Sequence, residues 1–309
     1  MKILSSTSGL SREEWLALRK QGIGGSDAGA ICGLNPWRSP IDVYVDKTNE
    51  KIEAEVETEA MRVGTDLEDY VARRFCEATG KKVHRKNVMM QSEEYPFMLA
   101  NVDRIVTGEK ALLECKTANA YAAEQWSDGK CPESYEIQCH HYMAVTGMEK
   151  VYLACLIMGI DFVICEIDRD EELIQNLCQI EKDFWENHVL AKRMPPPDGS
   201  ESAGNAIKEM YTASKEEILE LPQLGKQMER YDKISQQMSI LKEEQEQIKQ
   251  EIQLEMEEAD TAYIGDRKIT WKTTKPQVTL DSKKLKAEMP EIFEEYSKEG
   301  NPTRTFRIW

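Results

Sequence analysis

The sequence lacks a paired-cysteine motif and any long apolar run. Its eight cysteines are spread along apolar segments without a Cys-x-x-Cys pair, which favours reduced core residues over a disulfide framework or a zinc site. No run of about 18 apolar residues occurs, and no apolar signal segment stands at the N-terminus. We therefore expect a soluble intracellular protein without a membrane partner.

Basic charge is also scarce. The 309 residues include 40 Lys and Arg against 56 Asp and Glu, a net charge of −16, and the excess of acid extends through residues 1–200. Phosphate neutralisation supplies most of the affinity of proteins that coat nucleic acid, so the composition excludes that class. Any contact with DNA must be local. The basic residues at 73–74 and 81–86 could form such a surface, or they could be a solvated helix end.

The order of predicted elements indicates an α/β fold with a central mixed sheet flanked by helices. Helix signals occur at 11–20, where Ser11 and Glu14 form a capping box, and at 28–32, 59–79, 132–146 and 171–190. Strands are expected near 82–90, 96–106, 110–117, 151–157 and 162–167, and a glutamate-rich loop near 50–59.

A proline-rich segment at 194–199 is incompatible with a helix and predicts a domain boundary. We expect a first domain over 1–194, a linker over 195–200 and an accessory domain over 201–309. In that domain, apolar residues recur with heptad spacing from 234 to 252, which predicts an antiparallel helical pair with 219–231 or, alternatively, a helix that binds a partner. A β-hairpin near 262–272, a helix near 281–297 and a terminal strand over 305–309 should follow.

The most informative segments are two neighbouring apolar runs. The first ends at Asp103, and the second carries Glu114 and Lys116 on either side of Cys115. Side chains alternate along a strand, so Glu114 and Lys116 share a face while Cys115 points into the protein. If the runs pair antiparallel through the turn at 107–110, Asp103 arrives beside Glu114. Two converging carboxylates need a cation, and their hard oxygen atoms suit Mg²⁺ or Mn²⁺.

A lysine next to such a pair suits phosphodiester hydrolysis, in which the metal binds phosphate and water and the ammonium orients them. The alternative is an exposed cross-strand Glu–Lys ion pair and an aspartate in an ordinary turn. Glu68 would lie at the edge of the buried face of the 59–79 helix, as either a surface charge or a metal ligand. The glycine-rich segment 22–27, in which Ser26 or Asp27 can cap the 28–32 helix, is either an anion site or only a turn.

These features occur in the order Arg19, Ser26, Gly64-x-x-x-Glu68, Asp103, Glu114-x-Lys116 and Gln138. The order, with local matches at 22–28, 64–68, 113–116 and 137–142, resembles the YqaJ-type viral recombinase family, which includes phage lambda exonuclease, within the PD-(D/E)xK nuclease superfamily. The resemblance covers residues 12 to about 160 and assigns nothing to residues 200–309.

The resemblance implies a restriction-endonuclease-like core and a metal-dependent exonuclease. Such an enzyme digests one strand of linear double-stranded DNA from its 5′ end and leaves a 3′ overhang for a single-strand annealing protein. It also implies a ring-shaped homo-oligomer, a trimer in lambda exonuclease, and a phage or prophage origin in a bacterial cytoplasm.

By the same resemblance, Asp103 and Glu114 are the main metal ligands, with the backbone carbonyl of Cys115 as a third. Glu68 would bind a second ion or its water, with Asp66 as the alternative if the helix face is shifted.

Three further roles follow from the family. Lys116 would orient the attacking water rather than act as a general base, and Gln138 would hold the nucleophile or Lys116. Arg19 and Ser26 resemble a pocket that grips a 5′-phosphate, for which a guanidinium beside a helix N-terminus is apt. The adjacent His140 and His141 point in different directions on a helix, so packing roles are favoured over joint metal ligation.

Two rival functions stay open. One is a structure-selective or nicking endonuclease of the same superfamily, which would share the chemistry and differ in substrate access. The other is a noncatalytic recombination scaffold whose nuclease fold only holds DNA.

Overall fold

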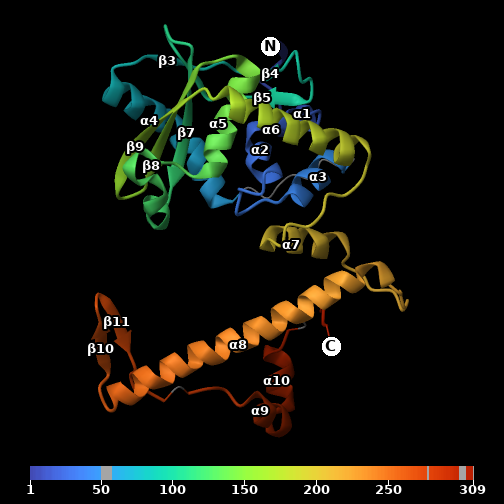
Figure 1. The fold of residues 1–309 in the computed structure, drawn as a ribbon, viewed down its shortest axis with the longest axis vertical. Coiled ribbons are helices and arrows are strands. Elements are labelled where there is room, and N and C mark those ends of the chain that lie inside the picture. Colours follow the sequence, from blue (N-terminus) through green and yellow to red (C-terminus); the bar gives the residue numbers. More distant parts are fainter. Residues whose placement is uncertain (50–57, 277, 299–303, 309) are drawn as a thin grey trace. The chain divides into compact units, whose positions relative to one another are not determined.

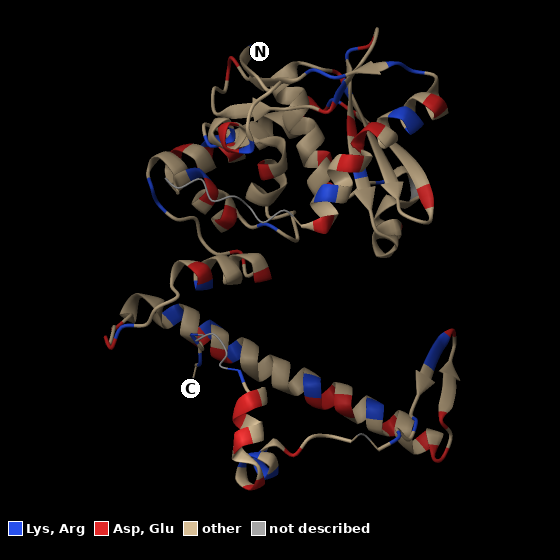
Figure 2. Cartoon of the chain, turned by 180° about the vertical axis from the view of Figure 1, so that it is seen from behind, with Lys and Arg blue, Asp and Glu red and all other residues tan. Residues whose placement is uncertain are grey.

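In a computed structural model of the chain, the described residues 1–49, 58–276, 278–298 and 304–308 belong to two compact units, Met1–Tyr211 and Thr212–Trp309 (Figure 1). Most of the expected glutamate-rich loop lies outside the described residues. Charged side chains of both signs occur along the elements of each unit (Figure 2). Within the described parts of the chain, we find no helix with the length and apolar character needed to cross a membrane.

The first unit contains a five-stranded mixed sheet in the order β3-β6-β7-β8-β9. Its strands are β3 (Val83–His84), β6 (Arg104–Val106), β7 (Ala111–Ala118), β8 (Lys150–Ile157) and β9 (Asp161–Asp168). β7 and β8 are parallel, and the other neighbours are antiparallel. A parallel pair needs a long crossover, which the 3₁₀ segment η1 (Ala120–Gly129) and α5 (Glu133–Thr146) supply here.

A second sheet, which the sequence did not predict, has the order β1-β4-β5-β2. It consists of β1 (Lys2–Ser6), β4 (Val88–Gln91), β5 (Met98–Ala100) and β2 (Ile23–Gly24). The predicted strands 82–90 and 96–106 were therefore wrong as single strands, because each is divided between the two sheets. The second division, between β5 and β6, leaves Asp103 in the short crossing between the sheets.

The remaining helices of this unit begin at local capping signals, although α3 and α7 were not predicted. They are α1 (Arg12–Arg19), α2 (Gly25–Ile31), α3 (Pro40–Thr48), α4 (Glu59–Thr79), α6 (Glu171–Phe184), which continues into the π-helical turn η2 (Trp185–Leu190), and α7 (Glu201–Met210). The capping box of Ser11 and Glu14 is present at α1. α2 begins earlier than predicted, because Asp27 accepts a hydrogen bond from the Gly24 amide and so closes the first turn.

Two helices cover opposite faces of the five-stranded sheet. α4 packs Val71 and Phe75 on one face, together with Leu113 of β7. α5 packs Cys139 and Met143 on the other, together with Leu112 and Leu153, which belong to β7 and β8. Strand alternation thus directs successive residues of β7 to different helices.

The predicted domain boundary was wrong. The first unit extends to Tyr211, since α7 buries Ala203 and Ala206 against Ile41 of α3. The Ser202 hydroxyl also donates to Asp42 at 2.7 Å. The proline-rich segment therefore lies within the first unit instead of dividing it from the second.

The second unit contains one long helix, α8 (Gly225–Met256), preceded by the 3₁₀ turn η3 (Pro222–Leu224). It also contains the hairpin of β10 (Thr261–Ile264) and β11 (Arg267–Thr270), then α9 (Ser282–Glu288) and α10 (Pro290–Tyr296). The predicted helical pair was wrong, because residues 225–231 belong to α8 itself and no proline or glycine interrupts that helix after its first residue. The helix near 281–297 is divided at Pro290, and residues 305–308 form no strand.

Candidate active site

β7 presents Glu114 and Lys116 side by side on the face that α5 covers. The Lys116 ammonium donates to Glu114 Oε1 at 2.9 Å, so the predicted shared face is confirmed. Cys115, between them, packs in the opposite core cluster with Val71 and Phe75. Glu114 is buried, with 5% of its surface exposed, which excludes the alternative of a solvent-exposed surface ion pair.

Asp103 reaches β7 through the antiparallel pairing of β6 and β7, as predicted. Arg104 lies opposite Leu113, and the Cys115 amide donates to Asp103 Oδ2 at 2.8 Å. Burial, then the carboxylates of Glu114 and Glu68, raise the pKa of Asp103 well above its ordinary value, although Lys116 acts in the opposite direction. Negative charge therefore accumulates at this point of the fold.

Gln138 of α5 completes the arrangement beneath the two β7 side chains. Its amide nitrogen donates to Glu114 Oε1 at 2.7 Å and to the Tyr142 hydroxyl at 2.9 Å, and its amide oxygen accepts from Lys116 at 3.1 Å. The Lys116 ammonium also lies 4.6 Å from the centre of the Tyr135 ring. Burial disfavours the ammonium, but Glu114 and Asp103 outweigh it and raise the pKa of Lys116, which stays charged.

Glu68 of α4 is held at the site by an ion pair with Arg104, a residue that sequence reasoning missed. The buried Arg104 donates to Glu68 Oε1 at 2.5 Å, to the Asp103 carbonyl at 2.7 Å and to Asp69 Oδ1 at 2.5 Å. Glu68 lines the cleft and acts on the Asp103 charge, whereas Asp66 is exposed. The position of Arg104 directly after Asp103 was the available signal, but no periodicity marks an arginine as buried.

A cleft of about 520 Å³ connects this acidic region with Arg19 and Ser26. Its lining includes the acidic Glu68 and Asp103, the pair Arg19 and Ser26, and Arg85 from the basic segment. The structure therefore brings together residues that lie far apart in the sequence.

Arg19 and Ser26 are in direct contact, with the guanidinium donating to the Ser26 hydroxyl at 2.7 Å. The Arg19 guanidinium also lies 4.8 Å from the centre of the Trp15 ring, and that of Arg12 lies 4.7 Å from it. The Trp15 indole donates to Asn101 at 3.3 Å, which holds the ring in the cleft wall.

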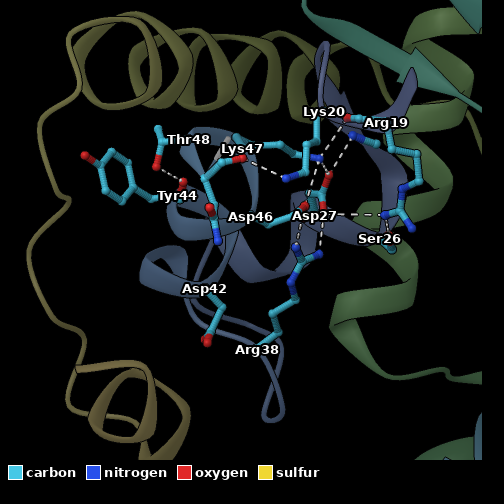
Figure 3. Close-up of polar contacts among 12 residues, drawn as sticks. Arg19, Lys20, Ser26, Asp27, Arg38, Asp42, Tyr44, Asp46, Lys47 and Thr48 are labelled. Carbon is cyan, nitrogen blue, oxygen red and sulfur yellow. Dashed lines mark hydrogen bonds and ion pairs between the residues drawn. The ribbon is translucent and has the colours of Figure 1, made fainter. Parts of the chain in front are cut away.

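A buried ion cluster behind Ser26 holds this corner together (Figure 3). Asp27, with no exposed surface, forms ion pairs with Lys47 at 2.8 Å, with Arg38, and with Arg19 at 3.6 Å. Burial opposes the Asp27 charge, but Lys47, Arg38 and Arg19 outweigh it and hold the pKa far below its ordinary value. Lys47 also donates to the Arg19 carbonyl at 3.0 Å, so it positions α1 as well.

The glycines of the 22–25 segment permit close approach. A Cβ at Gly22 would lie 2.3 Å from the Phe97 carbonyl, and one at Gly25 would lie 2.5 Å from the Tyr142 ring. Neither space admits a larger residue, so the glycines bring α2 against α5 and Ser26 into the cleft.

The two adjacent histidines have separate partners. His141 contacts Glu181 at 2.8 Å and the Leu99 carbonyl at 2.9 Å, whereas His140 contacts the Glu136 carbonyl at 3.0 Å. Over the described residues, no three His, Cys, Asp or Glu side chains lie close enough together to hold a metal ion by themselves. The acidic site thus consists of the neighbouring carboxylates Asp103 and Glu114, with Glu68 held beside them by Arg104.

Comparison with known proteins shows the family of the chain. Residues 14–149 match the YqaJ-like viral recombinase domain. Over 304 residues the chain is 41% identical to the uncharacterized protein YqaJ of Bacillus subtilis (strain 168), covering 96% of this chain and 94% of that relative.

Two solved structures share the fold. The alkaline exonuclease LHK-Exo from Laribacter hongkongensis has 22% identity and a TM-score of 0.50, covering 58% of this chain and 93% of that one. Its complex with dAMP gives a TM-score of 0.51 at the same identity and coverage. The matched family domain includes the cleft-lining residues from Trp15 to Tyr142, whereas Thr7 and Arg12, which also line the cleft, precede it. Together with the 41% identity to YqaJ over nearly the full length of both chains, this match shows that the chain belongs to the YqaJ-like viral recombinase family.

Proposed function

We propose that this protein is a metal-dependent 5′→3′ exonuclease that acts on linear double-stranded DNA and leaves 3′ single-stranded overhangs. The observation that carries the proposal is the single cleft lined by both the Asp103–Glu68 acidic region and the Arg19–Ser26 pair. Such a cleft can hold a terminal phosphate at one place and a phosphodiester at another. Family membership supports a role in recombination.

The donor set fits a hard divalent cation. Asp103 and Glu114 offer carboxylate oxygens, and because burial, then Glu114 and Glu68, raise the pKa of Asp103, a bound cation would favour its ionised form. We propose that these two carboxylates and the Cys115 carbonyl hold Mg²⁺ or Mn²⁺, with Glu68 serving a second ion. When bound, the metal would stabilise charge on the phosphate and activate water.

The chain's own residues orient the reacting groups. Burial opposes the Lys116 ammonium, but Glu114 and Asp103 raise its pKa, and in its charged form it would stabilise negative charge and position water rather than accept a proton. Gln138 contacts both Glu114 and Lys116 and fixes their mutual orientation. Held this way, the ammonium needs no reorganisation as phosphate charge develops.

We further propose that Arg19 and Ser26 bind the 5′-terminal phosphate of the strand being digested. A guanidinium and a hydroxyl are suitable donors to a phosphate, and both groups line the cleft. The 3′ overhang produced would be the substrate of a single-strand annealing protein in a bacterial cytoplasm. The ring assembly implied by the family resemblance stays a prediction.

The deciding experiment uses a linear duplex labelled at either its 5′ or its 3′ ends, with a closed circle of the same sequence as control. We expect Mg²⁺-dependent release of 5′ label as mononucleotides, retention of 3′ label and an intact circle. Cutting of the circle would favour the endonuclease alternative. Binding of duplex ends without any release of label would favour the scaffold alternative.

A further inference from the structure

α8 carries an apolar seam that is largely exposed within its own unit. The side chains of residues 225–250 are all exposed among the described residues. Seam residues include Ile234 at 39% exposure, Met238 at 51%, Leu241 at 63% and Ile248 at 50%. The helix has 32 residues, a length of about 48 Å. Most helical stability in proteins comes from the packing of an apolar face, so we expect this seam to have a partner.

The spacing of the seam indicates another helix as that partner. In heptads lettered a to g, Ile234, Leu241 and Ile248 occupy d positions, whereas Met238, Gln245 and Ile252 occupy a positions. This alternation of four and three residues is the pattern of a coiled coil. The predicted intrachain pair with 219–231 does not form, so we take the partner helix from another chain.

The charges beside the seam select the orientation of that partner. Glu244 occupies a g position, and Lys242 and Lys249 occupy e positions, with acid and base interleaved along α8 in Figure 2. In a parallel, in-register pair, Glu244 of one copy faces Lys249 of the next. An antiparallel pair centred on the seam places Glu244 against Glu244 and Lys242 against Lys242. The sequence of α8 is thus complementary to a parallel copy of itself.

Gln245, the single polar residue of the seam, determines the register of the two helices. Gln245 interrupts the apolar positions of α8 near the middle of the seam. A shifted or antiparallel partner would bury its amide against an apolar side chain, whereas in register it meets the same amide of the neighbouring copy.

We propose that α8 forms a parallel, in-register coiled coil with α8 of another copy of this chain. The inference does not depend on the proposed nuclease activity, since α8 lies outside the residues that line the cleft and outside the matched domain at 14–149. It gives the second unit a role in assembly.

A cysteine cross-linking experiment on the full-length chain tests orientation and register together. Gln245→Cys should form a covalent dimer under mild oxidation, because parallel register brings both thiols to the same seam layer. Ser239→Cys, on the outer face of the same helix, is the matched control and should form no covalent dimer. The wild-type chain is oxidised in parallel to account for its own cysteines. Equal cross-linking at both positions, or none at 245, would overturn the proposal.

Charge reversal in the Gln245→Cys background provides a second measurement. Glu244→Lys alone and Lys249→Glu alone should each reduce cross-linking at a fixed dilute concentration by roughly tenfold, because each places like charges together. Mixing the two variants should restore cross-linking between them. Yields that are the same in the single variants and in the mixture would contradict a parallel pair. Circular dichroism of each variant verifies that the helix content is retained.

Discussion

At the scale of single residues, the negative charge of Asp103 is unfavourable in the metal-free protein but is needed for the proposed metal site. Burial, Glu114 and Glu68 raise its pKa, so its ionised form is unfavourable in metal-free protein above an unfolded pKa of about 3.9. Asp103→Asn should therefore raise the midpoint of urea unfolding in EDTA at pH near 7. The same change should lower metal-dependent nucleotide release by more than about a hundredfold, because even outer partners of a metal site contribute about 10- to 100-fold.

Metal binding supplies a control for this variant. Mn²⁺ should stabilise the wild-type chain against unfolding but not Asp103→Asn, since a ligand stabilises only the state that binds it. Asp66→Asn, exposed on α4, should behave like wild type in both measurements. Equal Mn²⁺ stabilisation of wild type and Asp103→Asn would remove Asp103 from the proposed metal site.

Arg104 is the residue through which α4 is joined to the site. Arg104→Lys keeps the charge but loses the planar fork that contacts Glu68 and Asp69 at once. We expect nucleotide release to fall by about 10- to 100-fold, as for other residues that position a metal site. Asp69→Asn is the matched control and should have a small effect, because Asp69 is largely exposed and the bond to Glu68 remains. Similar losses in the two variants would indicate a general disturbance of α4.

Arg19→Ala should distinguish the two kinds of DNA end. Digestion of 5′-phosphorylated duplexes should slow by at least about tenfold, because one charge-assisted contact to phosphate contributes about 1.5 kcal/mol or more. Digestion of 5′-hydroxyl duplexes should change much less. The ratio of the two initial rates measures the effect, and an unchanged ratio would contradict a phosphate role for Arg19.

At the scale of elements, the buried Asp27 cluster joins α1, α2 and α3. Asp27→Asn leaves Lys47 buried without its carboxylate and should reduce the free energy of unfolding by about 3–5 kcal/mol at neutral pH. Because the folded pKa of Asp27 is depressed, its contribution is complete above the unfolded pKa of about 3.9 and declines as the pH falls below that value. Urea unfolding at pH 7 and pH 3 should show the difference from wild type shrinking at the lower pH.

Asp46→Asn is the control for that prediction. Asp46 contacts the same Arg38 and Lys47, at 3.2 and 3.4 Å, but its side chain is 36% exposed. Its substitution should reduce the free energy of unfolding by less than about 1 kcal/mol. Losses of equal size for Asp27→Asn and Asp46→Asn would show that burial does not govern the cluster.

At the scale of the whole molecule, the boundary after Tyr211 predicts which fragment folds independently. A fragment of residues 1–211 should keep the cleft and release nucleotides from duplex ends. A fragment of residues 1–200 lacks α7 and exposes Ile41, which should lower the free energy of unfolding by about 1.5–3 kcal/mol relative to the longer fragment. Equal unfolding midpoints for the two fragments would place the boundary where the proline-rich segment suggested.

Predictions from local sequence patterns were correct where the residues of a single helix or strand determined the structure. The helix at 59–79 has the predicted bounds because Gly80 ends it in a left-handed conformation. The shared face of Glu114 and Lys116 follows from strand alternation alone. Predictions were wrong where pairing with other strands determined the structure. The predicted strand 96–106 is an example, because its two halves belong to different sheets.

The candidate site shows the same division. Asp103, Glu114 and Lys116 were predictable because a short turn brings two consecutive strands together. Arg104 and Lys47 were not, because nothing in a linear pattern shows that a charged side chain is buried among carboxylates from other helices. Burial of charge depends on segments that fold around it.

The sequence by itself determined the family, the acidic and basic groups of the site and the heptad pattern of α8, because each is a property of residue type and short spacing. Only the tertiary structure decided that Arg19 and Ser26 share a cleft with Asp103, that α7 belongs to the first unit and that the α8 seam is exposed. These outcomes depend on packing between distant segments, and packing is set by the shape of the whole fold rather than by local preference.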